Sequence, residues 1–484
     1  MRKVKIVCTL GPSTTGVEKL RQLIDAGMDV ARLNFSHGTH EEHRKMYLNV
    51  REAAAGAGKP LAVIGDLCGP KIRAGRMKGG AAELKPGRTI ILTAEDRMGD
   101  SERISHSYPP LARDAKPGDR ILLDDGLLEF VVESVQGGDV RCRVVSGGIL
   151  KDHKGMNFPT MNISAPAITE KDREDLRFAR ELGVDYLALS FVRRPEDIIA
   201  AKELSTGIPV IAKIEKPEAV ERLEEILRAA DGAMVARGDL GVEAGPEKVP
   251  LLQKRIIRDV KKFAKPVITA TQMLDSMIRN PRPTRAEVSD AANAVLDGTD
   301  AVMLSGETSV GQYPVEAVQT LRTVIEEIES NSARSPDVHM PRPCPETGGR
   351  RPPAEHTFSS AIADACVEIS RCLKLAALAV YTETGRSAAL LSAQRPDANV
   401  IAFSRHRQAL NRLALFWGVK PLNGQWVKGV EGVVEQAEEE LLKHGLVKPG
   451  EDIAVTFGMV IDREPFQTNI LKLWKIRNGR HPRT

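Results

Sequence analysis

Eight short aliphatic runs recur along the chain, and most of them are followed by a segment in which apolar residues have helical spacing. Strands buried on both faces of a parallel sheet read as such runs, and a helix usually connects one parallel strand to the next. Eight β-α units over about 250 residues predict a TIM (β/α)8 barrel. The predicted strands begin at Lys5, Met28, Leu61, Tyr186, Val210, Gly232, Pro266 and Ala301.

Some helices of this barrel can be predicted individually. Residues 16–26 and 217–230 have the 3.6-residue apolar rhythm of an amphipathic helix. A threonine followed three residues later by a carboxylate resembles a capping box, in which each side chain bonds the backbone N–H of the other. Two predicted helices open in this way, at Thr284 with Glu287 and at Thr169 with Asp172.

One connection is far too long for a barrel loop. More than a hundred residues separate the third predicted strand from the fourth, whereas connections in compact domains have a median of about 4–6 residues. Residues 74–159 are rich in glycine and in alternating strand-like segments, and they predict an inserted β-barrel lid domain with a hairpin turn at 137–139. Residues 1–73 and 160–333 then form the barrel.

The chain changes character after the eighth unit. Residues 334–354 are polar and rich in proline, which predicts a linker. Residues 355–484 alternate helical and aliphatic segments and predict a C-terminal α/β domain. The basic segment 471–484 could be an arm for nucleic acid, but its aromatic residues are not interleaved for stacking. We therefore expect a solvated C-terminus.

Composition limits the classes of partner and compartment. The chain has 484 residues with 69 basic and 65 acidic side chains, so its net charge of +4 implies no polyanionic partner. Six scattered cysteines without a CxxC pair are typical of a reducing compartment. No apolar window approaches the roughly 18 residues of a membrane span, and the N-terminal apolar stretch is too short for a signal peptide. A cytoplasmic protein that binds neither nucleic acid nor membrane is expected.

Polar or charged residues stand at the carboxyl end of every predicted barrel strand. These ends form the active-site face of a TIM barrel. Loops begin polar in any protein, so two or three such ends would be expected by chance, whereas eight of eight indicate one polar site. The residues are Thr9; Arg32, Asn34 and Ser36; Asp66; Ser190; Lys213 and Glu215; Arg237 and Asp239; Thr271; and Ser305 and Glu307.

A lysine and two carboxylates indicate the chemistry of this site. Lys213 and Glu215 are two positions apart in a strand and therefore share one face, and Asp239 ends the next strand. Two carboxylates suit Mg²⁺ (or Mn²⁺), which prefers oxygen ligands and keeps positions open for water and substrate oxygens. The lysine adds a second positive charge aimed at the same anion. The arrangement predicts phosphate or enolate chemistry.

Structural roles are the alternative for these residues: an internal ion pair, a cation between strands, a helix N-cap or a satisfied hydroxyl. These alternatives apply in turn to Lys213 with Glu215, to Arg32, to Asp66 and Asp239, and to Thr271. In the inserted domain, residues 124–126 (Asp-Asp-Gly) look like a metal-binding loop but are predicted to form a turn.

Nine segments, taken in order, carry a specific resemblance. They are CTLGPS (8–13), ARLNFSHGTHE (31–41), GPKIR (69–73), SFVR (190–193), KIE (213–215), MVARGDLG (234–241), ATQMLDSMI (270–278), PRPTRAEVSDAANAVLDGTD (281–300) and MLSGET (303–308). Together they resemble the pyruvate kinase family; the inserted and C-terminal domains match mainly in position and length. The resemblance implies glycolytic phosphoryl transfer from phosphoenolpyruvate to ADP by an allosteric homotetramer.

The resemblance also implies a role for each matching residue, with Thr271 a candidate on the path of enolate protonation. The implied residues are, for the divalent metal, Glu215 and Asp239; for catalysis, Lys213, Arg32, Arg73 and Thr271; for substrate binding, Arg32, Lys213, Gly238, Asp239, Thr271 and Ser190; and for the nucleotide, Asn34, Ser36, His37, Arg73 and Lys154.

One departure concerns a monovalent cation. Family members that require K⁺ have Glu where this chain has Lys71, and commonly Thr where it has Leu67. The family's K⁺ ligands Asn34, Ser36 and Asp66 are nevertheless present. Because an ammonium near that position supplies the same unit charge, we predict activity that does not require K⁺.

The C-terminal domain carries a candidate effector loop. Residues 382–387 (TETGRS) follow a predicted strand and open a helix, a setting that binds phosphate, although an ordinary helix N-terminus is the alternative. The loop resembles the family's effector loop for sugar phosphates, and a nucleotide effector is also possible. The contacts implied are Thr382, Thr384, Arg386 and Ser387. Acidic residues at 462–464 disfavour a bisphosphate effector.

Two other functions are weighed against this one. A metal-dependent pyruvate aldolase on a similar barrel explains Glu215 and Asp239, but neither the lid nor the arginine at position 32. A catalytically silent metabolite sensor predicts broken strand-end residues, and none is broken.

Overall fold

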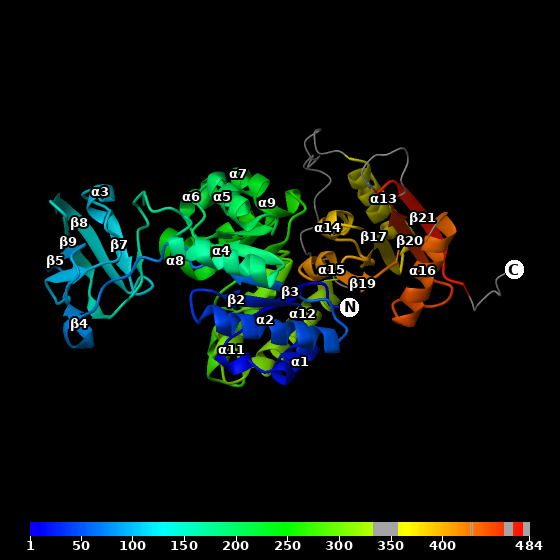
Figure 1. Ribbon diagram of the computed structural model, residues 1–484, viewed down its shortest axis with the longest axis horizontal. Coiled ribbons are helices and arrows are strands. Elements are labelled where there is room, and N and C mark those ends of the chain that lie inside the picture. Colours follow the sequence, from blue (N-terminus) through cyan, green and yellow to red (C-terminus); the bar gives the residue numbers. More distant parts are fainter. Residues whose placement is uncertain (333–356, 426, 428, 459–467, 478–484) are drawn as a thin grey trace.

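The computed structural model describes residues 1–332, 357–425, 427, 429–458 and 468–477. Three domains lie in a row, with a β domain at one end, the barrel in the middle and an α/β domain at the other end (Figure 1). The predicted fold class is confirmed. The predicted linker at 334–354 and the acidic residues at 462–464 lie outside the described residues.

The central domain is a closed barrel of eight parallel strands in the order β1-β16-β15-β14-β13-β12-β3-β2. All eight predicted strands are present. Its interior is filled by aliphatic side chains such as Val7, Ile64 and Met234, while the outer faces of the strands pack against the helices. The strands are β1 (Lys5–Thr9), β2 (Val30–Asn34), β3 (Ala62–Asp66), β12 (Tyr186–Leu189), β13 (Val210–Ile214), β14 (Gly232–Ala236), β15 (Val267–Ala270) and β16 (Ala301–Leu304).

Helices surround this barrel, and both predicted capping boxes are confirmed. Thr169 opens α4 and Thr284 opens α10, each exchanging bonds with the carboxylate three residues later. None of the described helices is both long and apolar enough to cross a bilayer. The helices are α1 (Val17–Ala26), α2 (His40–Gly56), α4 (Glu170–Leu182), α5 (Pro195–Ser205), α6 (Pro217–Glu221), α7 (Leu223–Ala229), α8 (Arg237–Ala244), α9 (Val249–Lys262), α10 (Arg285–Leu296), α11 (Gly306–Ser309) and α12 (Pro314–Ser332).

The single helix predicted over 217–230 is wrong. The segment forms two helices, α6 and α7, because the backbone of Arg222 leaves the helical region at φ −99° and ψ 22°. Apolar spacing did not reveal the break, since a kink at one residue leaves the surrounding pattern nearly intact.

The inserted domain is built from β strands and packs its own apolar core. Its strands form a six-stranded sheet, β11-β7-β8-β9-β5-β6, and a two-stranded sheet, β10-β4, whereas among the described sheets only the central one closes on itself. The hairpin turn is confirmed between β8 and β9, and residues 124–126 form the predicted turn. The elements are β4 (Ala81–Leu84), β5 (Thr89–Thr93), β6 (Arg103–Ser105), α3 (Leu111–Asp114), β7 (Arg120–Leu123), β8 (Leu128–Gln136), β9 (Asp139–Ser146), β10 (Gly148–Lys151) and β11 (Met156–Asn157).

The C-terminal domain is a five-stranded sheet in the order β19-β18-β17-β20-β21, flanked by helices. Only β21 runs antiparallel to its neighbour. Buried residues on the two faces of the sheet form separate apolar clusters. The elements are α13 (Phe358–Leu373), β17 (Ala377–Tyr381), α14 (Arg386–Ala393), β18 (Asn399–Ser404), α15 (Arg407–Leu413), β19 (Val419–Asn423), α16 (Gly429–Lys443), β20 (Asp452–Phe457) and β21 (Ile470–Lys475).

The prediction of a solvated tail from residue 471 onward is wrong for its first residues. Residues 470–475 form β21, which pairs along its whole length with β20. The sequence concealed this strand because an edge strand buries little, and Leu473 is 44% exposed. Its partner β20 determines the conformation through backbone hydrogen bonds that composition does not report.

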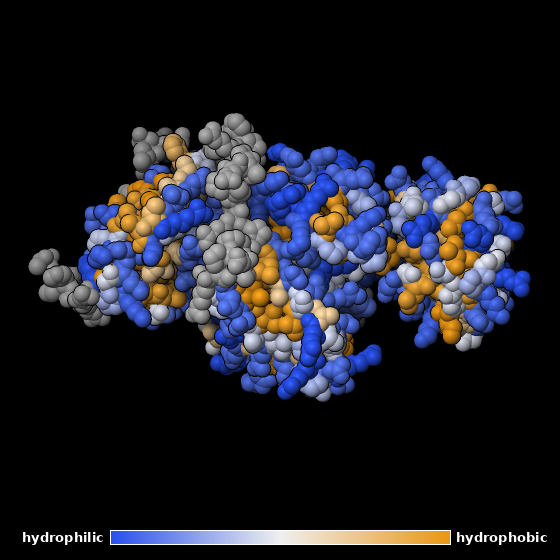
Figure 2. Space-filling model, turned by 180° about the vertical axis from the view of Figure 1, so that it is seen from behind, coloured by the Kyte–Doolittle hydropathy of each residue, from blue (hydrophilic) through white to orange (hydrophobic). Residues whose placement is uncertain are grey.

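The surface differs between the domains. In the view from behind, hydrophilic residues cover most of the barrel, and hydrophobic patches are visible on both the inserted domain and the C-terminal domain (Figure 2). Exposed apolar side chains of the inserted domain include Leu127, Val145 and Ile149.

Candidate active site

Most of the predicted strand-end residues converge on one cavity of about 100 Å³, whereas Thr9, Asp66, Arg237 and Glu307 do not line it. It lies at the carboxyl ends of the barrel strands. Arg32, Ser190, Lys213, Glu215, Asp239 and Thr271 line it together with Asn34, Ser36 and Lys71. The parallel register brings these residues, far apart in the sequence, to the same edge of the barrel.

Two buried cations share the carboxylate of Asp66. Arg32 Nε lies 2.6 Å from Asp66 Oδ2, and Lys213 Nζ lies 3.4 Å from Asp66 Oδ1. Arg32 also donates to Thr9 Oγ1 at 3.0 Å. Burial alone would raise the pKa of Asp66, but the charges of Lys213 and Arg32 outweigh it and hold the pKa below its usual value. Asp66 is therefore an ionised anchor for both cations and not a helix cap.

Lys213 and Glu215 form an internal ion pair, the structural role that the sequence left open for them. Lys213 Nζ lies 2.9 Å from Glu215 Oε1 and donates to Ser190 Oγ at 2.7 Å. Burial disfavours the Lys213 charge, but Asp66 and Glu215 raise its pKa above the usual value. The ammonium therefore stays charged inside the cavity.

The pKa of Glu215 lies closer to neutral pH than that of an ordinary glutamate. Burial raises its pKa to about 6, with Asp239 adding to the rise and Lys213 opposing it. Its Oε2 accepts a bond of 2.7 Å from the backbone N–H of Phe191, a residue with φ 55° in the left-handed region. Phe191 also lines the cavity, and nothing in its residue type revealed this role.

The first turn of α8 contains Asp239 and also bonds the side chain of Thr271. The N-cap of α8 is Ala236, so Asp239 stands at the third helical position and does not cap the helix. The backbone N–H of Gly238 donates to Thr271 Oγ1 at 2.8 Å, and Thr271 donates to Ala270 O at 2.7 Å. The Thr271 hydroxyl therefore has hydrogen-bond partners within the protein, which is the structural role that the sequence left open for it. Thr271 nevertheless also lines the cavity.

The carboxylates of Glu215 and Asp239 suit a divalent ion. Both line the cavity, and the charge of Asp239 contributes to the raised pKa of Glu215. Among the described residues, no three His, Cys, Asp or Glu side chains gather in a metal-binding group. Mg²⁺ prefers oxygen ligands and keeps positions open for water and substrate oxygens, so two carboxylates are a compatible ligand set.

Family models identify the chain. The model for the pyruvate kinase barrel domain matches residues 1–318, and the model for the pyruvate kinase alpha/beta domain matches residues 360–474. The chain belongs to the pyruvate kinase family.

Individual pyruvate kinases are similar over nearly the whole chain. The enzyme of Geobacillus stearothermophilus is 45% identical over 98% of this chain and 80% of its own length. That of Mycobacterium tuberculosis is 46% identical over 94% of this chain and 95% of its own. The crystal structure of a pyruvate kinase from Cryptosporidium parvum superposes with a TM-score of 0.87 at 36% identity, covering 98% of this chain and 96% of that one. Members of the family are phosphotransferases.

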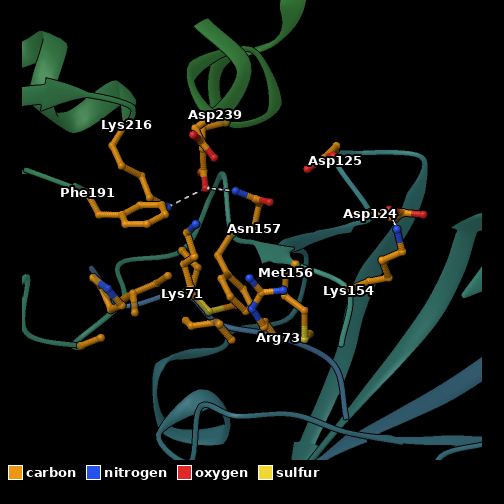
Figure 3. A pocket seen from close by; sticks show the side chains of 18 of the residues that line it. Lys71, Arg73, Asp124, Asp125, Lys154, Met156, Asn157, Phe191, Lys216 and Asp239 are labelled. Carbon is orange, nitrogen blue, oxygen red and sulfur yellow. Dashed lines mark hydrogen bonds and ion pairs between the residues drawn. The ribbon is translucent and has the colours of Figure 1, made fainter. Parts of the chain in front are cut away.

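A second cavity, of about 290 Å³, lies between the lid and the barrel (Figure 3). Glu243 of α8 accepts bonds at one oxygen from Lys216 Nζ at 2.8 Å and from the lid residue Asn157 at 2.9 Å. Its other oxygen is buried and has no partner among the described residues. Sequence reasoning missed these three residues, although Lys216 directly follows the KIE motif.

The lid side of this cavity carries the other expected cations. Arg73 donates to the backbone oxygen of His153 at 2.9 Å, and Lys154 lies 2.7 Å from Asp124 Oδ1. His37 has a pKa below its usual value because of burial and the nearby Lys71, Arg73 and Arg32. The cavity is lined by charges of both signs, because carboxylates such as Asp124 and Asp125 lie among these cations.

Lys71 lies beside the expected monovalent-cation position. Its ammonium donates to Ser36 Oγ at 3.2 Å. Asn34 Oδ1 accepts from the backbone N–H of Ser36 at 3.2 Å. The carbonyl oxygen of Leu67 is engaged by Ser190 Oγ at 2.7 Å, and both oxygens of Asp66 face protein cations.

Some predicted residues lie elsewhere. Glu307 lies in α11, just after β16, and is structural, because its carboxylate accepts bonds of 2.9 and 2.7 Å from the backbone N–H groups of Leu274 and Ser305. The candidate effector loop lies in the C-terminal domain, at the start of α14, on the opposite side of the barrel from the lid (Figure 1). There Thr382 Oγ1 accepts from the backbone N–H of Gly385 at 3.0 Å.

Proposed function

We propose that the mouth of the barrel transfers the phosphoryl group of phosphoenolpyruvate to ADP, giving pyruvate and ATP. In this step the P–O bond to the enolpyruvate oxygen breaks, and a P–O bond to the terminal phosphate of ADP forms. One observation carries the assignment of residues: Arg32 and Lys213, both buried and both fixed by Asp66, face the cavity that Glu215 and Asp239 also line.

Arg32 and Lys213 are proposed to bind the moving phosphoryl group. Phosphoryl transfer asks the protein mainly for positioning and for positive charge. Because Asp66 and Thr9 already hold these side chains in place, little reorganisation is needed when substrate arrives. Lys213 would also stabilise the enolate that remains. Arg73 would assist from the lid junction, where it bonds the backbone of His153.

Glu215 and Asp239 are proposed to hold Mg²⁺, or Mn²⁺ in its place. When bound, the ion supplies a Lewis acid for the substrate carboxylate and enolate oxygens. The fit rests on two oxygen ligands whose mutual repulsion contributes to the raised pKa of Glu215.

The substrate carboxylate is proposed to lie against Gly238, Thr271 and Ser190. Gly238 lacks a side chain, so its backbone can approach the substrate closely. Thr271 is proposed to lie on the path by which a proton reaches the enolate carbon.

The nucleotide is proposed to bind between the barrel and the lid. Asn34, Ser36 and His37 would face it from the barrel, and Arg73 and Lys154 from the lid side. The support is the positive charge near His37. Burial lowers the pKa of this histidine, and the charges of Lys71, Arg73 and Arg32 lower it further. A closed lid would exclude water, which competes with ADP for the phosphoryl group.

The contacts of Lys71 are the basis for proposing that the enzyme is active without K⁺. Its ammonium reaches Ser36, and Asp66 is already compensated by Arg32 and Lys213. The position bounded by Asn34, Ser36, Asp66 and Leu67 therefore has a unit positive charge beside it.

The remaining assignments rest on the family. We propose the domain limits 1–73 with 160–333, 74–159 and 355–484, a cytoplasmic location and a homotetramer. A sugar phosphate or a nucleotide would bind as effector at Thr382, Thr384, Arg386 and Ser387. A fixed conformation of that loop is supported by the bond from Gly385 N–H to Thr382 Oγ1 within it and by the bond between Ser387 Oγ and Thr468 Oγ1 outside it, at 2.5 Å.

A lactate-dehydrogenase-coupled assay with phosphoenolpyruvate, ADP and Mg²⁺ tests the function. Pyruvate formation that depends on both substrates is expected. A pyruvate aldolase would instead release pyruvate from an aldol substrate without ADP, and a silent sensor would release none. Either result would refute the proposal.

A further inference from the structure

Arg237 donates hydrogen bonds to three consecutive backbone carbonyls of the neighbouring strand end. The parallel register pairs Ala236 with Ala270, the last residues of β14 and β15, so the residues that follow them, Arg237 and Thr271, lie side by side. Arg237 Nη2 lies 2.7 Å from Thr271 O and 3.2 Å from Gln272 O, and Nε lies 3.3 Å from Ala270 O. The side chain is only 9% exposed. A planar guanidinium can span several acceptors in this way, whereas an ammonium cannot.

The backbone that Arg237 bonds has an unusual conformation. Thr271 has φ 68° and Gln272 has φ 53°, both in the left-handed region. A β-branched residue such as threonine rarely adopts this conformation, and it persists only when its surroundings hold it. The bonds from Arg237 supply that support because they engage the carbonyls of both left-handed residues.

The same turn of α8 also holds the Thr271 side chain. The backbone N–H of Gly238, next to Arg237, donates to Thr271 Oγ1 at 2.8 Å. Asp239 follows directly. One three-residue segment therefore fixes the backbone of Thr271, fixes its hydroxyl and carries a carboxylate of the proposed metal site.

We propose that Arg237 is a positioning residue for phosphoryl transfer. It holds the Thr271 hydroxyl in a fixed place relative to Asp239, and it acts through Thr271 without touching substrate. The inference rests on the proposed role of Thr271. A displacement of about 1 Å at a reacting group can cost roughly 100-fold in rate, so loss of this support should appear in kcat.

The opposite side of the guanidinium provides a matched control. Arg237 Nη1 lies 2.8 Å from Asp290 Oδ1, on α10, and the Asp290 side chain is 42% exposed. Asp290 contacts the cation but not the turn. If charge pairing were the purpose of Arg237, the loss of Asp290 would matter as much as the loss of the arginine.

The test is a double-mutant cycle on the full-length chain. We would compare Arg237→Lys, Arg237→Met, Thr271→Ala, Asp290→Asn and the double variant Arg237→Lys/Thr271→Ala. The measurements are kcat and KM for phosphoenolpyruvate, thermal unfolding, and exchange of the pyruvate methyl protons with deuterated water by NMR. Proton exchange isolates the enolate step from phosphoryl transfer.

Arg237→Lys and Arg237→Met are expected to lower kcat and methyl exchange by roughly 10- to 100-fold, with KM changed by less than about threefold. The double variant should be no slower than Thr271→Ala, and Asp290→Asn should stay within about threefold of the wild type.

Additive losses in the double variant, a wild-type rate for Arg237→Lys, an equal loss in Asp290→Asn, or failure of both Arg237 variants to fold would each overturn the positioning role. A wild-type rate in Thr271→Ala would overturn the proposed role of Thr271 as well, so the two failures are distinguishable.

Discussion

The ammonium of Lys71 donates a hydrogen bond of 3.2 Å to the hydroxyl of Ser36, on the side of the barrel mouth where a monovalent cation is expected. Asp66, the anionic residue of that position, is meanwhile compensated by Arg32 and Lys213. A protein cation thus lies next to a hydroxyl that is proposed to border the monovalent-cation position.

Exchanging this charge should create a requirement for K⁺. Lys71→Glu removes the ammonium and adds an anion beside Ser36, so we expect low activity in Na⁺ or tetramethylammonium and recovery in K⁺. The wild type should be nearly indifferent to the cation. The coupled assay across K⁺ concentrations measures both, with Lys45→Glu, on the exposed face of α2, as the matched control. A wild type that loses most of its activity without K⁺ would contradict the prediction.

Removing the Lys213 ammonium should abolish most turnover. Lys213→Met keeps the length of the side chain but removes the charge that faces the moving phosphoryl group. Loss of one preorganised electrostatic contact of this kind costs roughly 10²–10³-fold in kcat. Phosphoenolpyruvate binding, followed by equilibrium titration, should remain measurable. The control is Lys202→Met, on α5, which breaks an ion pair with Asp231. Turnover near that of the wild type in Lys213→Met would rule out the role.

Mg²⁺ binding should weaken as the pH falls through about 6. Burial, with Asp239, raises the pKa of Glu215 to about 6, so the carboxylate gains a proton at a pH where an ordinary glutamate is still ionised. Protons and Mg²⁺ then compete for Glu215. The Mg²⁺ concentration for half-maximal activity should rise below pH 6 and stay flat above pH 7.

Saturating Mg²⁺ should move the acidic limb of the pH profile to lower pH. Glu215→Gln cannot titrate, so it should need much more Mg²⁺ at every pH and lose the limb. An unchanged limb in this variant would assign the titration to another group.

The lid contact at Glu243 should control nucleotide affinity. Asn157→Asp replaces a donor to Glu243 by a second carboxylate, so the closed lid gains a repulsion in place of a bond of 2.9 Å. A hydrogen bond to a charged group is worth about 1.5–3 kcal/mol, which corresponds to a rise of roughly tenfold or more in KM for ADP. Asn157→Ala, without the repulsion, should have a smaller effect. Equal KM values for all three proteins would show that the contact does not act on lid closure.

Much of the fold was predictable because local chemistry and global topology agree. All eight barrel strands were evident from aliphatic runs, and Thr169 and Thr284 marked helix starts correctly. The break at Arg222 and the strand at 470–475 were not evident. A kink leaves apolar spacing almost unchanged, and an edge strand depends on a partner distant in sequence.

The sequence by itself determined which groups the site contains: its strand-end arginines, lysines and carboxylates, and the lysine at position 71. Only the tertiary structure decided which of these groups bond to one another. It set Asp66 between Arg32 and Lys213, joined Lys216 and Asn157 at Glu243, and placed Arg237 against the carbonyls beside Thr271. The reason is that each side chain is specified by its own position in the sequence, whereas its hydrogen-bond partners depend on strand register and helix packing between residues far apart in the sequence.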